Sequence, residues 1–162
     1  MTKIVQAGSN SPRPGSSNGS APGSAVSEMR ISIGSDLDII QARQTGRTEA
    51  SKLGFSTTDL TLIATAISEL ARNIVMYAKQ GEIILRFIHA SEKQGIVIIA
   101  SDQGPGMADP NQALQDGYST SRSLGLGLPG VRRLMDEFEI ESKLGQGTVV
   151  TIKKWTVRHV LD

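Results

Sequence analysis

The sequence IVIIASDQGPG, residues 96–106, joins an apolar run to an acidic, glycine-rich turn. The run is rich in β-branched residues and predicts a buried strand. Asp102 stands at the end of this strand, and Gly104 and Gly106 allow the backbone to turn sharply and to approach a flat base closely. An ionised carboxylate there can accept a hydrogen bond from an exocyclic amino group such as that of adenine. Taken alone, an Asp-x-Gly turn needs no ligand, so the rest of the chain has to decide.

A second polar pair occurs in Glu69-Leu-Ala-Arg-Asn73, inside a helical pattern that can begin at Thr58 and end near Lys79. Glu69 and Asn73 are four residues apart and therefore share one face of this helix. Asn73 offers an amide oxygen to Mg²⁺, an ion that needs few protein ligands when phosphates are also bound. Glu69, one turn earlier, is our candidate for the general base of a phosphoryl transfer. Such pairs are otherwise mostly solvated helix edges.

A glycine-rich segment, Gly125-Leu-Gly-Leu-Pro-Gly130, satisfies the G-x-G-x-x-G pattern of dinucleotide sites. The segment before it, residues 119–123, is polar throughout, whereas a nicotinamide or flavin site requires a buried strand there. The segment instead predicts a phosphate loop in which Gly125 and Gly127 expose backbone N–H groups beside a helix that opens near Pro129. A loop without a ligand is the alternative.

Residues 103–126 form a connection that is too long to be an ordinary loop, and loops of this length are commonly functional lids or disordered. Thr148 follows Gly145 and Gly147 at the exit of a predicted hairpin. Its small hydroxyl is a candidate ligand-binding group, although a simple β-turn also explains the segment.

Apolar periodicity predicts the order strand, helix, helix, strand, strand, lid, helix, strand, strand. We therefore expect an α+β fold: a two-layer α/β sandwich whose mixed, mostly antiparallel sheet carries its helices on one face. The bare face must be polar or covered by a partner. The predicted elements are a strand from Met29, helices over 35–54 and 58–79, strands over 82–90 and 95–100, a short helix near 110–116, a helix over 128–138, and strands over 139–144 and 148–155.

Composition limits the remaining possibilities. Gly, Ser, Asn or Pro occupy fifteen of the seventeen positions 8–24, so we expect a flexible tail over residues 1–27 and one folded domain over residues 28–162. A net charge of +1 gives no support for nucleic-acid binding. The absence of cysteine excludes a disulfide framework, and no apolar stretch reaches the roughly 20 residues of a membrane span. We expect a cytoplasmic protein.

Four segments in this order resemble the N, G1, G2 and G3 boxes of the GHKL ATPase and kinase superfamily. Within it, the short single-domain form and the stretches Ile67-Ser-Glu-Leu-Ala-Arg-Asn73 and Asp116-Gly-Tyr-Ser-Thr-Ser121 look most like the RsbT-type switch kinases of the bacterial stressosome. The resemblance covers roughly residues 28–155. The four segments are Glu69-Leu-Ala-Arg-Asn73, Asp102-Gln-Gly-Pro-Gly106, Gly125-Leu-Gly-Leu128 and Gly145-Gln-Gly-Thr148.

The resemblance implies the Bergerat (GHKL) fold, with ATP and Mg²⁺ as cofactors. It also implies that the protein phosphorylates Ser or Thr in STAS-domain scaffold proteins and then activates a downstream phosphatase-type regulator. Many relatives have a third lid glycine at the position of Pro129, so the lid here is expected to be stiffer or to hold nucleotide less tightly. The implied roles are Asp102 and, through a water, Thr148 for adenine; Gly104 and Gly106 for the adenine-side wall; Gly125 and Gly127 for the ATP lid; Asn73 for Mg²⁺; and Glu69 as base.

A second hypothesis belongs to another class: a non-catalytic ATP-binding module that sequesters a regulator, as anti-sigma relatives do. Glu69 favours catalysis without excluding this module. A histidine-kinase catalytic domain is disfavoured because the phosphoacceptor helix pair is missing. The chain lacks G-x-x-x-x-G-K-[ST] and H-R-D, which excludes Walker-type NTPases and eukaryotic-type kinases.

Overall fold

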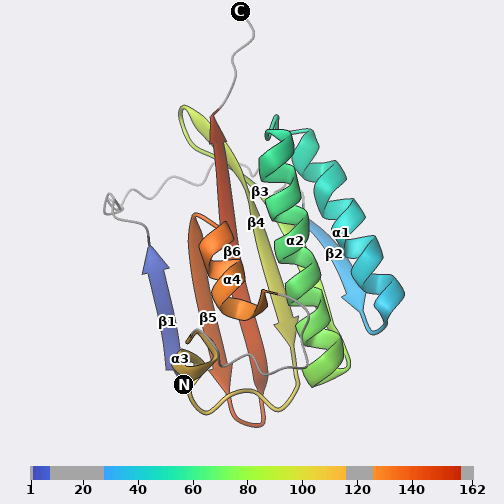
Figure 1. Cartoon of the computed structure of the whole chain (residues 1–162), viewed down its shortest axis with the longest axis vertical. Coiled ribbons are helices and arrows are strands. Elements are labelled where there is room, and N and C mark those ends of the chain that lie inside the picture. Colours follow the sequence, from blue (N-terminus) through green and yellow to red (C-terminus); the bar gives the residue numbers. More distant parts are fainter. Residues whose placement is uncertain (1, 8–27, 116–125, 158–162) are drawn as a thin grey trace, which may run out of the picture.

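A computed structural model describes residues 2–7, 28–115 and 126–157. Its strands form one six-stranded sheet in the order β1-β5-β6-β4-β3-β2, and the long helices pack on one face of it (Figure 1). The predicted two-layer α+β sandwich is confirmed, but all five strand pairings are antiparallel, so the sheet is not mixed. The strands are β1 Thr2–Ala7, β2 Glu28–Ile33, β3 Gly81–His89, β4 Lys93–Asp102, β5 Glu137–Lys143 and β6 Gly147–Val157. The helices are α1 Asp36–Ser51, α2 Thr57–Asn73, the π-helix η1 Ile74–Ala78, α3 Pro110–Ala113 and α4 Gly127–Leu134.

The main helix boundaries follow from caps. Ser35 caps α1, because its hydroxyl accepts a hydrogen bond from the N–H of Asp38. The cap of α2 is Ser56, whose hydroxyl accepts from the N–H of Asp59, and not Thr58. No described helix is long and apolar enough to cross a membrane.

Two segments differ from the sequence-based expectation. The tail predicted over residues 1–27 lies outside the described residues except for residues 2–7, which form β1 on the edge of β5. The composition that predicted the tail belongs to residues 8–24 only. The helix predicted over 128–138 ends at Leu134, because the alternation around Phe138 places every second side chain in the core and pairs this segment with β6.

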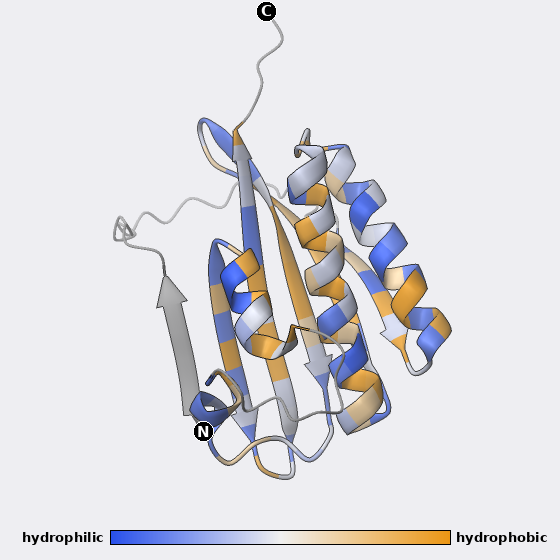
Figure 2. Cartoon of the chain, viewed as in Figure 1, coloured by the Kyte–Doolittle hydropathy of each residue, from blue (hydrophilic) through white to orange (hydrophobic). Residues whose placement is uncertain are grey.

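The core lies between the helices and the sheet. The apolar stripe of α2 packs on β3 and β4, and Figure 2 shows β4 mostly in the colour of apolar residues. The helices α1 and α2 approach closely at Gly46, where an added Cβ would lie 2.1 Å from the Cδ1 atom of Ile67. The largest side chains with almost no exposed surface are Ile33, Ile63, Ile67, Leu70, Ile74, Ile83, Leu85, Ile96, Ile98, Ile140, Ile152 and Val131.

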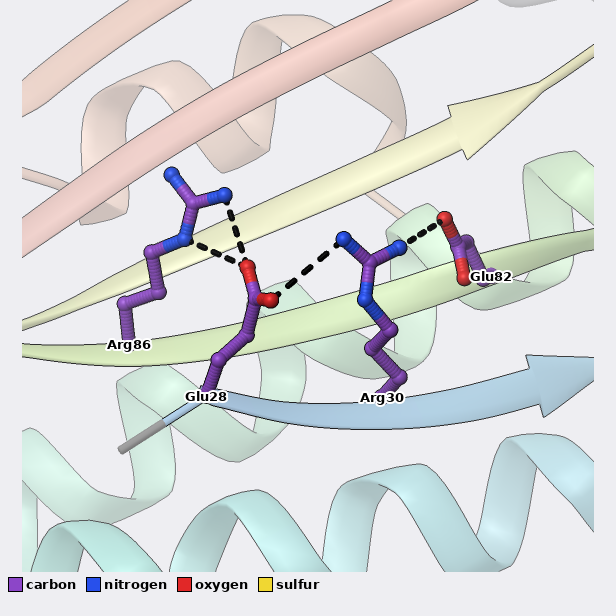
Figure 3. Close-up of polar contacts among 4 residues, drawn as sticks. All are labelled: Glu28, Arg30, Glu82 and Arg86. Atoms are coloured by element: carbon purple, nitrogen blue, oxygen red, sulfur yellow. Dashed lines mark hydrogen bonds and ion pairs between the residues drawn. The ribbon is translucent and has the colours of Figure 1, made fainter. Parts of the chain in front are cut away.

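The opposite face of the sheet carries charged ladders, as Figure 3 shows for β2 and β3. Arg86 and Arg30 both bind the carboxylate of Glu28, and Arg30 also pairs with Glu82 at 2.8 Å. The hydrogen bond from Arg86 and the charges of both arginines lower the pKa of Glu28. Ile84 is buried on this face beside these long side chains. Of the two expectations for this face, polar or covered by a partner, the polar one is met along β2 and β3.

Two neighbouring isoleucines of β4 test which face is covered. Ile98 faces the helices and has 0% exposed surface, whereas Ile99 faces the charged ladders and is partly exposed. We expect Ile98→Ala to lower the free energy of unfolding by roughly 2 to 5 kcal/mol, because the surrounding core cannot fill the space that the side chain leaves. The control, Ile99→Ala, should cost less than about half of that, since less surface is buried. Urea unfolding of both variants measures this, and equal losses would contradict the assigned faces.

Candidate functional site

A cavity of about 760 Å³ opens at the end of the sheet where β4 ends and β6 begins. Asp102 lies at the last position of β4, and Thr148 lies directly opposite it on β6. Asn73 enters the same lining from the last residue of α2, and Gly127 enters it from the first residue of α4. Gly106 also lines the cavity, so the fold brings together five predicted site residues from segments far apart in the sequence.

The cavity walls are mostly apolar. They carry aliphatic and thioether side chains, which suit the faces of a flat heterocycle. Tyr77, from η1, is 62% exposed at the margin. The size falls within the usual range of small-molecule sites, about 300 to 1,000 Å³. The apolar wall residues are Leu70, Ile74, Met107, Leu128 and Val150.

The carboxylate of Asp102 is fixed at one oxygen. Oδ1 accepts a hydrogen bond of 2.9 Å from the N–H of Gly104, two residues later. Within the described part of the chain, no group donates to Oδ2. Because the side chain is half-buried and lines the cavity, Oδ2 remains available as an acceptor for a ligand.

Glycines allow the backbone turns around Asp102 to pack tightly. Gly147 has a φ of +108°, and an added Cβ would lie 2.0 Å from the carbonyl oxygen of Asp102. Gly106 has a φ of +68°, and an added Cβ would lie 2.1 Å from the carbonyl oxygen of Lys143. An added Cβ at Gly104 would lie 2.6 Å from the Cβ of Ala78 in η1. Gly106 lines the cavity, whereas Gly104 lies behind that lining. Side chains at these positions would force the turns apart.

Thr148 is held by a buried residue that the sequence analysis did not single out. Ser142 is 4% exposed and its Oγ accepts a hydrogen bond of 2.8 Å from the N–H of Met107. The Ser142 hydroxyl donates to the carbonyl of Gly147 at 3.1 Å, so the Thr148 hydroxyl, 2.8 Å away, is the donor between the two. Thr148 therefore presents acceptor lone pairs to the cavity. A polar residue at a core-facing strand position is the signal that marks Ser142.

Glu69, a predicted site residue, does not line this cavity. It is 6% exposed, and both carboxylate oxygens are bound. Oε1 accepts a hydrogen bond of 2.9 Å from Arg72, and Oε2 accepts one of 3.3 Å from the N–H of Gly127. Because Gly127 does line the cavity, Glu69 lies directly behind the wall at this point. The sequence analysis did not identify Arg72, although it lies within the quoted Glu69–Asn73 segment.

The lid is only partly described. Gly127 has a φ of +64°, a left-handed conformation that suits glycine at the start of α4. Gly125, and the Asp116–Ser121 segment, lie outside the described residues.

The polar groups of the cavity fit a nucleotide with Mg²⁺ better than a metal held by protein alone. No group of three or more His, Cys, Asp or Glu side chains among the described residues is arranged to hold a metal ion. Mg²⁺ needs no such group where phosphates and waters supply most ligands, and Asn73 offers one amide oxygen.

Comparison with known proteins assigns the family. The model of the histidine kinase-like ATPase domain matches residues 36–154. Serine/threonine-protein kinase RsbT of Bacillus subtilis (strain 168) is 51% identical over 125 residues, which cover 77% of this chain and 94% of that protein. An anti-sigma F factor of Caldanaerobacter subterraneus subsp. tengcongensis is 32% identical over 116 residues, covering 68% of this chain and 80% of the relative.

Among solved structures, the mycobacterial sensor histidine kinase MprB aligns with a TM-score of 0.47 at 15% identity, over 84% of this chain and 100% of that one. The family model and the two sequence relatives cover most of the domain that contains the cavity. The chain therefore belongs to the histidine kinase-like ATPase domain family, in the group that includes serine/threonine-protein kinase RsbT and the anti-sigma F factors.

Proposed function

We propose that this protein is a Mg-ATP-dependent protein serine/threonine kinase of a bacterial partner-switching pathway. The observation that carries the proposal is that Asp102 of β4 and Asn73 of α2 line the same cavity. The 51% identity to a serine/threonine-protein kinase supports the reaction type.

Asp102 is the proposed adenine-reading residue. Its Oδ1 is occupied by the Gly104 N–H, which fixes the carboxylate plane and leaves Oδ2 to accept from the exocyclic amino group. Thr148 adds acceptor lone pairs next to it, suitable for a bridging water. Gly106 lines the adenine side, and Gly104 supports it from behind.

Asn73 is the proposed magnesium ligand, and Gly125 and Gly127 are the proposed phosphate-binding lid positions. When bound, Mg²⁺ neutralises charge on the phosphates. The positive end of the α4 dipole favours negative charge in the same direction, while the N–H of Gly127 is donated to Glu69.

Glu69 is the proposed general base. In the transfer, the substrate hydroxyl oxygen forms a bond to the γ-phosphorus while the bond from that phosphorus to its bridging oxygen breaks, so that ADP leaves. The hydroxyl proton passes to the Glu69 carboxylate. Glu69 is adjacent to the cavity wall, because its Oε2 accepts the N–H of Gly127, which lines the cavity.

The proposed substrates are STAS-domain scaffold proteins, and the proposed later partner is a phosphatase-type regulator, in the cytoplasm. A second candidate is a non-catalytic ATP-binding module that sequesters a regulator. It is favoured by the position of Glu69 outside the cavity lining and by the relatives named anti-sigma F factors.

Replacing the base separates the two candidates. We expect Glu69→Gln to bind ATP as the wild type does and to lose phosphate transfer by a factor of about 100 or more, because the amide cannot take the hydroxyl proton. Transfer from labelled ATP to a STAS-domain scaffold measures this. The control is Glu92→Gln, an exposed change in the β3–β4 turn. Binding of ATP without transfer by the wild type would favour the sequestering module.

The adenine role of Asp102 has its own test. We expect Asp102→Asn to weaken ATP binding about 10- to 100-fold, since a neutral amide is a weaker acceptor and can present a donor to the amino group. Calorimetry measures the affinity, with Asp36→Asn as an exposed control that removes the same charge. An unchanged affinity for ATP would remove Asp102 from the adenine site.

The metal role of Asn73 predicts a dependence on magnesium. We expect Asn73→Ala to abolish the magnesium-dependent transfer while ATP binding in the presence of EDTA stays within about twofold of wild type, because only a metal ligand is lost. The control is Asn111→Ala, an exposed residue of α3 outside the cavity lining. Full transfer by Asn73→Ala would show that Asn73 does not hold the ion.

A further inference from the structure

A cleft of about 500 Å³ lies between α1 and α2, two helices that run side by side (Figure 1). These two helices supply its whole lining, which shares no residue with the lining of the nucleotide cavity. We call it the α1–α2 cleft. Arg43, Arg47 and Arg72 line it together with Glu69, and the other lining side chains carry only hydroxyl, amide or methyl groups.

The charges in the α1–α2 cleft are not balanced. Glu69 pairs with Arg72, whereas neither Arg43 nor Arg47 forms an ion pair with any residue that the structure describes. Arg47 donates to the hydroxyl of Thr61, at 3.3 Å. Within the described part of the chain, two exposed guanidinium groups therefore lack a counter-charge. A guanidinium group matches a carboxylate in a bidentate geometry, so the cleft is complementary to acidic side chains.

In the ion pair between Arg72 and Glu69, the arginine is much more exposed than the carboxylate. The Arg72 side chain is 40% exposed and that of Glu69 is 7% exposed. A carboxylate entering the cleft can therefore reach Arg72 from solvent without entering the protein interior. Arg72 would then exchange one carboxylate for another and stay paired, while Glu69 would keep the N–H of Gly127 as its partner.

Glu69 connects the cleft to the nucleotide cavity. Its Oε2 accepts the N–H of Gly127, which lines that cavity, while its Oε1 is held by Arg72 in the cleft. When Arg72 turns to another carboxylate, Oε1 loses its partner. This oxygen is then free to turn and to accept a proton.

We propose that the α1–α2 cleft docks an acidic segment of the protein substrate, whose carboxylates pair with Arg43 and Arg47 and draw Arg72 away from Glu69. Docking thereby releases the base only when a substrate is present. This inference rests on the proposed role of Glu69. A nucleic acid is the less suitable occupant, because the cationic groups form a short cluster between two helices and the chain as a whole has a net charge of +1.

The docking step is tested with a fluorescein-labelled peptide of six glutamates as the probe, measured by anisotropy at low ionic strength. We expect Arg43→Gln/Arg47→Gln to weaken peptide binding about tenfold or more, because two charge-assisted contacts are lost. The control Lys52→Gln/Lys93→Gln also removes two exposed positive charges, but outside the cleft, and should bind like wild type. Equal weakening in both double variants, or displacement of the peptide by an equal concentration of single-stranded DNA, would overturn the assignment.

The release step is tested by ATP hydrolysis with and without the same peptide. We expect the peptide to accelerate hydrolysis severalfold in the wild type. Arg72→Ala should hydrolyse ATP faster without the peptide and gain nothing from it, since nothing holds Oε1. An Arg72→Ala variant that is still accelerated would overturn the coupling. Arg72→Gln, whose amide can still donate to Glu69, serves if the alanine variant does not fold, and should also lose the response to the peptide.

The proposed kinase function and the proposed docking site can be disproved separately. Peptide binding does not require catalysis, so a Glu69→Gln variant that retains full phosphate transfer would remove the proposed base while the docking result stands. Loss of the docking result alone, with transfer still dependent on Glu69, would remove the cleft and keep the kinase.

Discussion

The register of β4 against β6 is the constraint on which the cavity depends. This pairing sets Asp102 opposite Thr148, and the next pairing sets Thr148 opposite Ser142, all on the face that the helices cover. A slip by one residue would turn each of these side chains to the charged face. What prevents the slip is the alternation of buried side chains, such as Ile98, along the same strands. The polar site is therefore fixed by apolar packing.

The end of α2 completes the site from above the sheet. After Asn73 the helix continues as the π-helix η1, a form that is rare and frequently found at functional sites. Gly81 permits the close approach, because an added Cβ there would lie 2.8 Å from the Cγ2 atom of Ile74 and 2.5 Å from the carbonyl of Ser101. Because Gly81 has no side chain, η1 can pack directly on β3. Tyr77 of η1 then lies at the margin of the cavity.

Local patterns predicted the parts of this structure that depend on local chemistry. The apolar run of residues 96–100 predicted its strand, and the helical pattern of residues 58–79 predicted the helix that carries Glu69 and Asn73. The end of α4 was not predictable in this way, because pairing with β6 decides it. Ser142 was missed for the same reason, since its hydrogen bonds reach Met107 and Thr148 through the folded sheet.

The environment of Glu69 also depends on distant segments. Helical spacing places Glu69 beside Arg72, but only the folded chain brings the N–H of Gly127, 58 residues away, to its second oxygen. From the sequence, Glu69 and Asn73 share a face and were expected to share a cavity. In the structure a difference of four positions is enough to place them in two cavities, since α2 separates the cleft from the nucleotide site.

A buried carboxylate has to be paired, and this requirement links stability to the proposed activity of Glu69. Desolvating the charge without partners would be costly, so the fold supplies a guanidinium and a backbone N–H. The same partners occupy the lone pairs that a base needs. A base in this position can therefore act only if one partner is exchanged, and Arg72 is the partner that solvent can reach. A substrate that binds Arg72, the exposed partner, can therefore change the pairing of Glu69, the buried one.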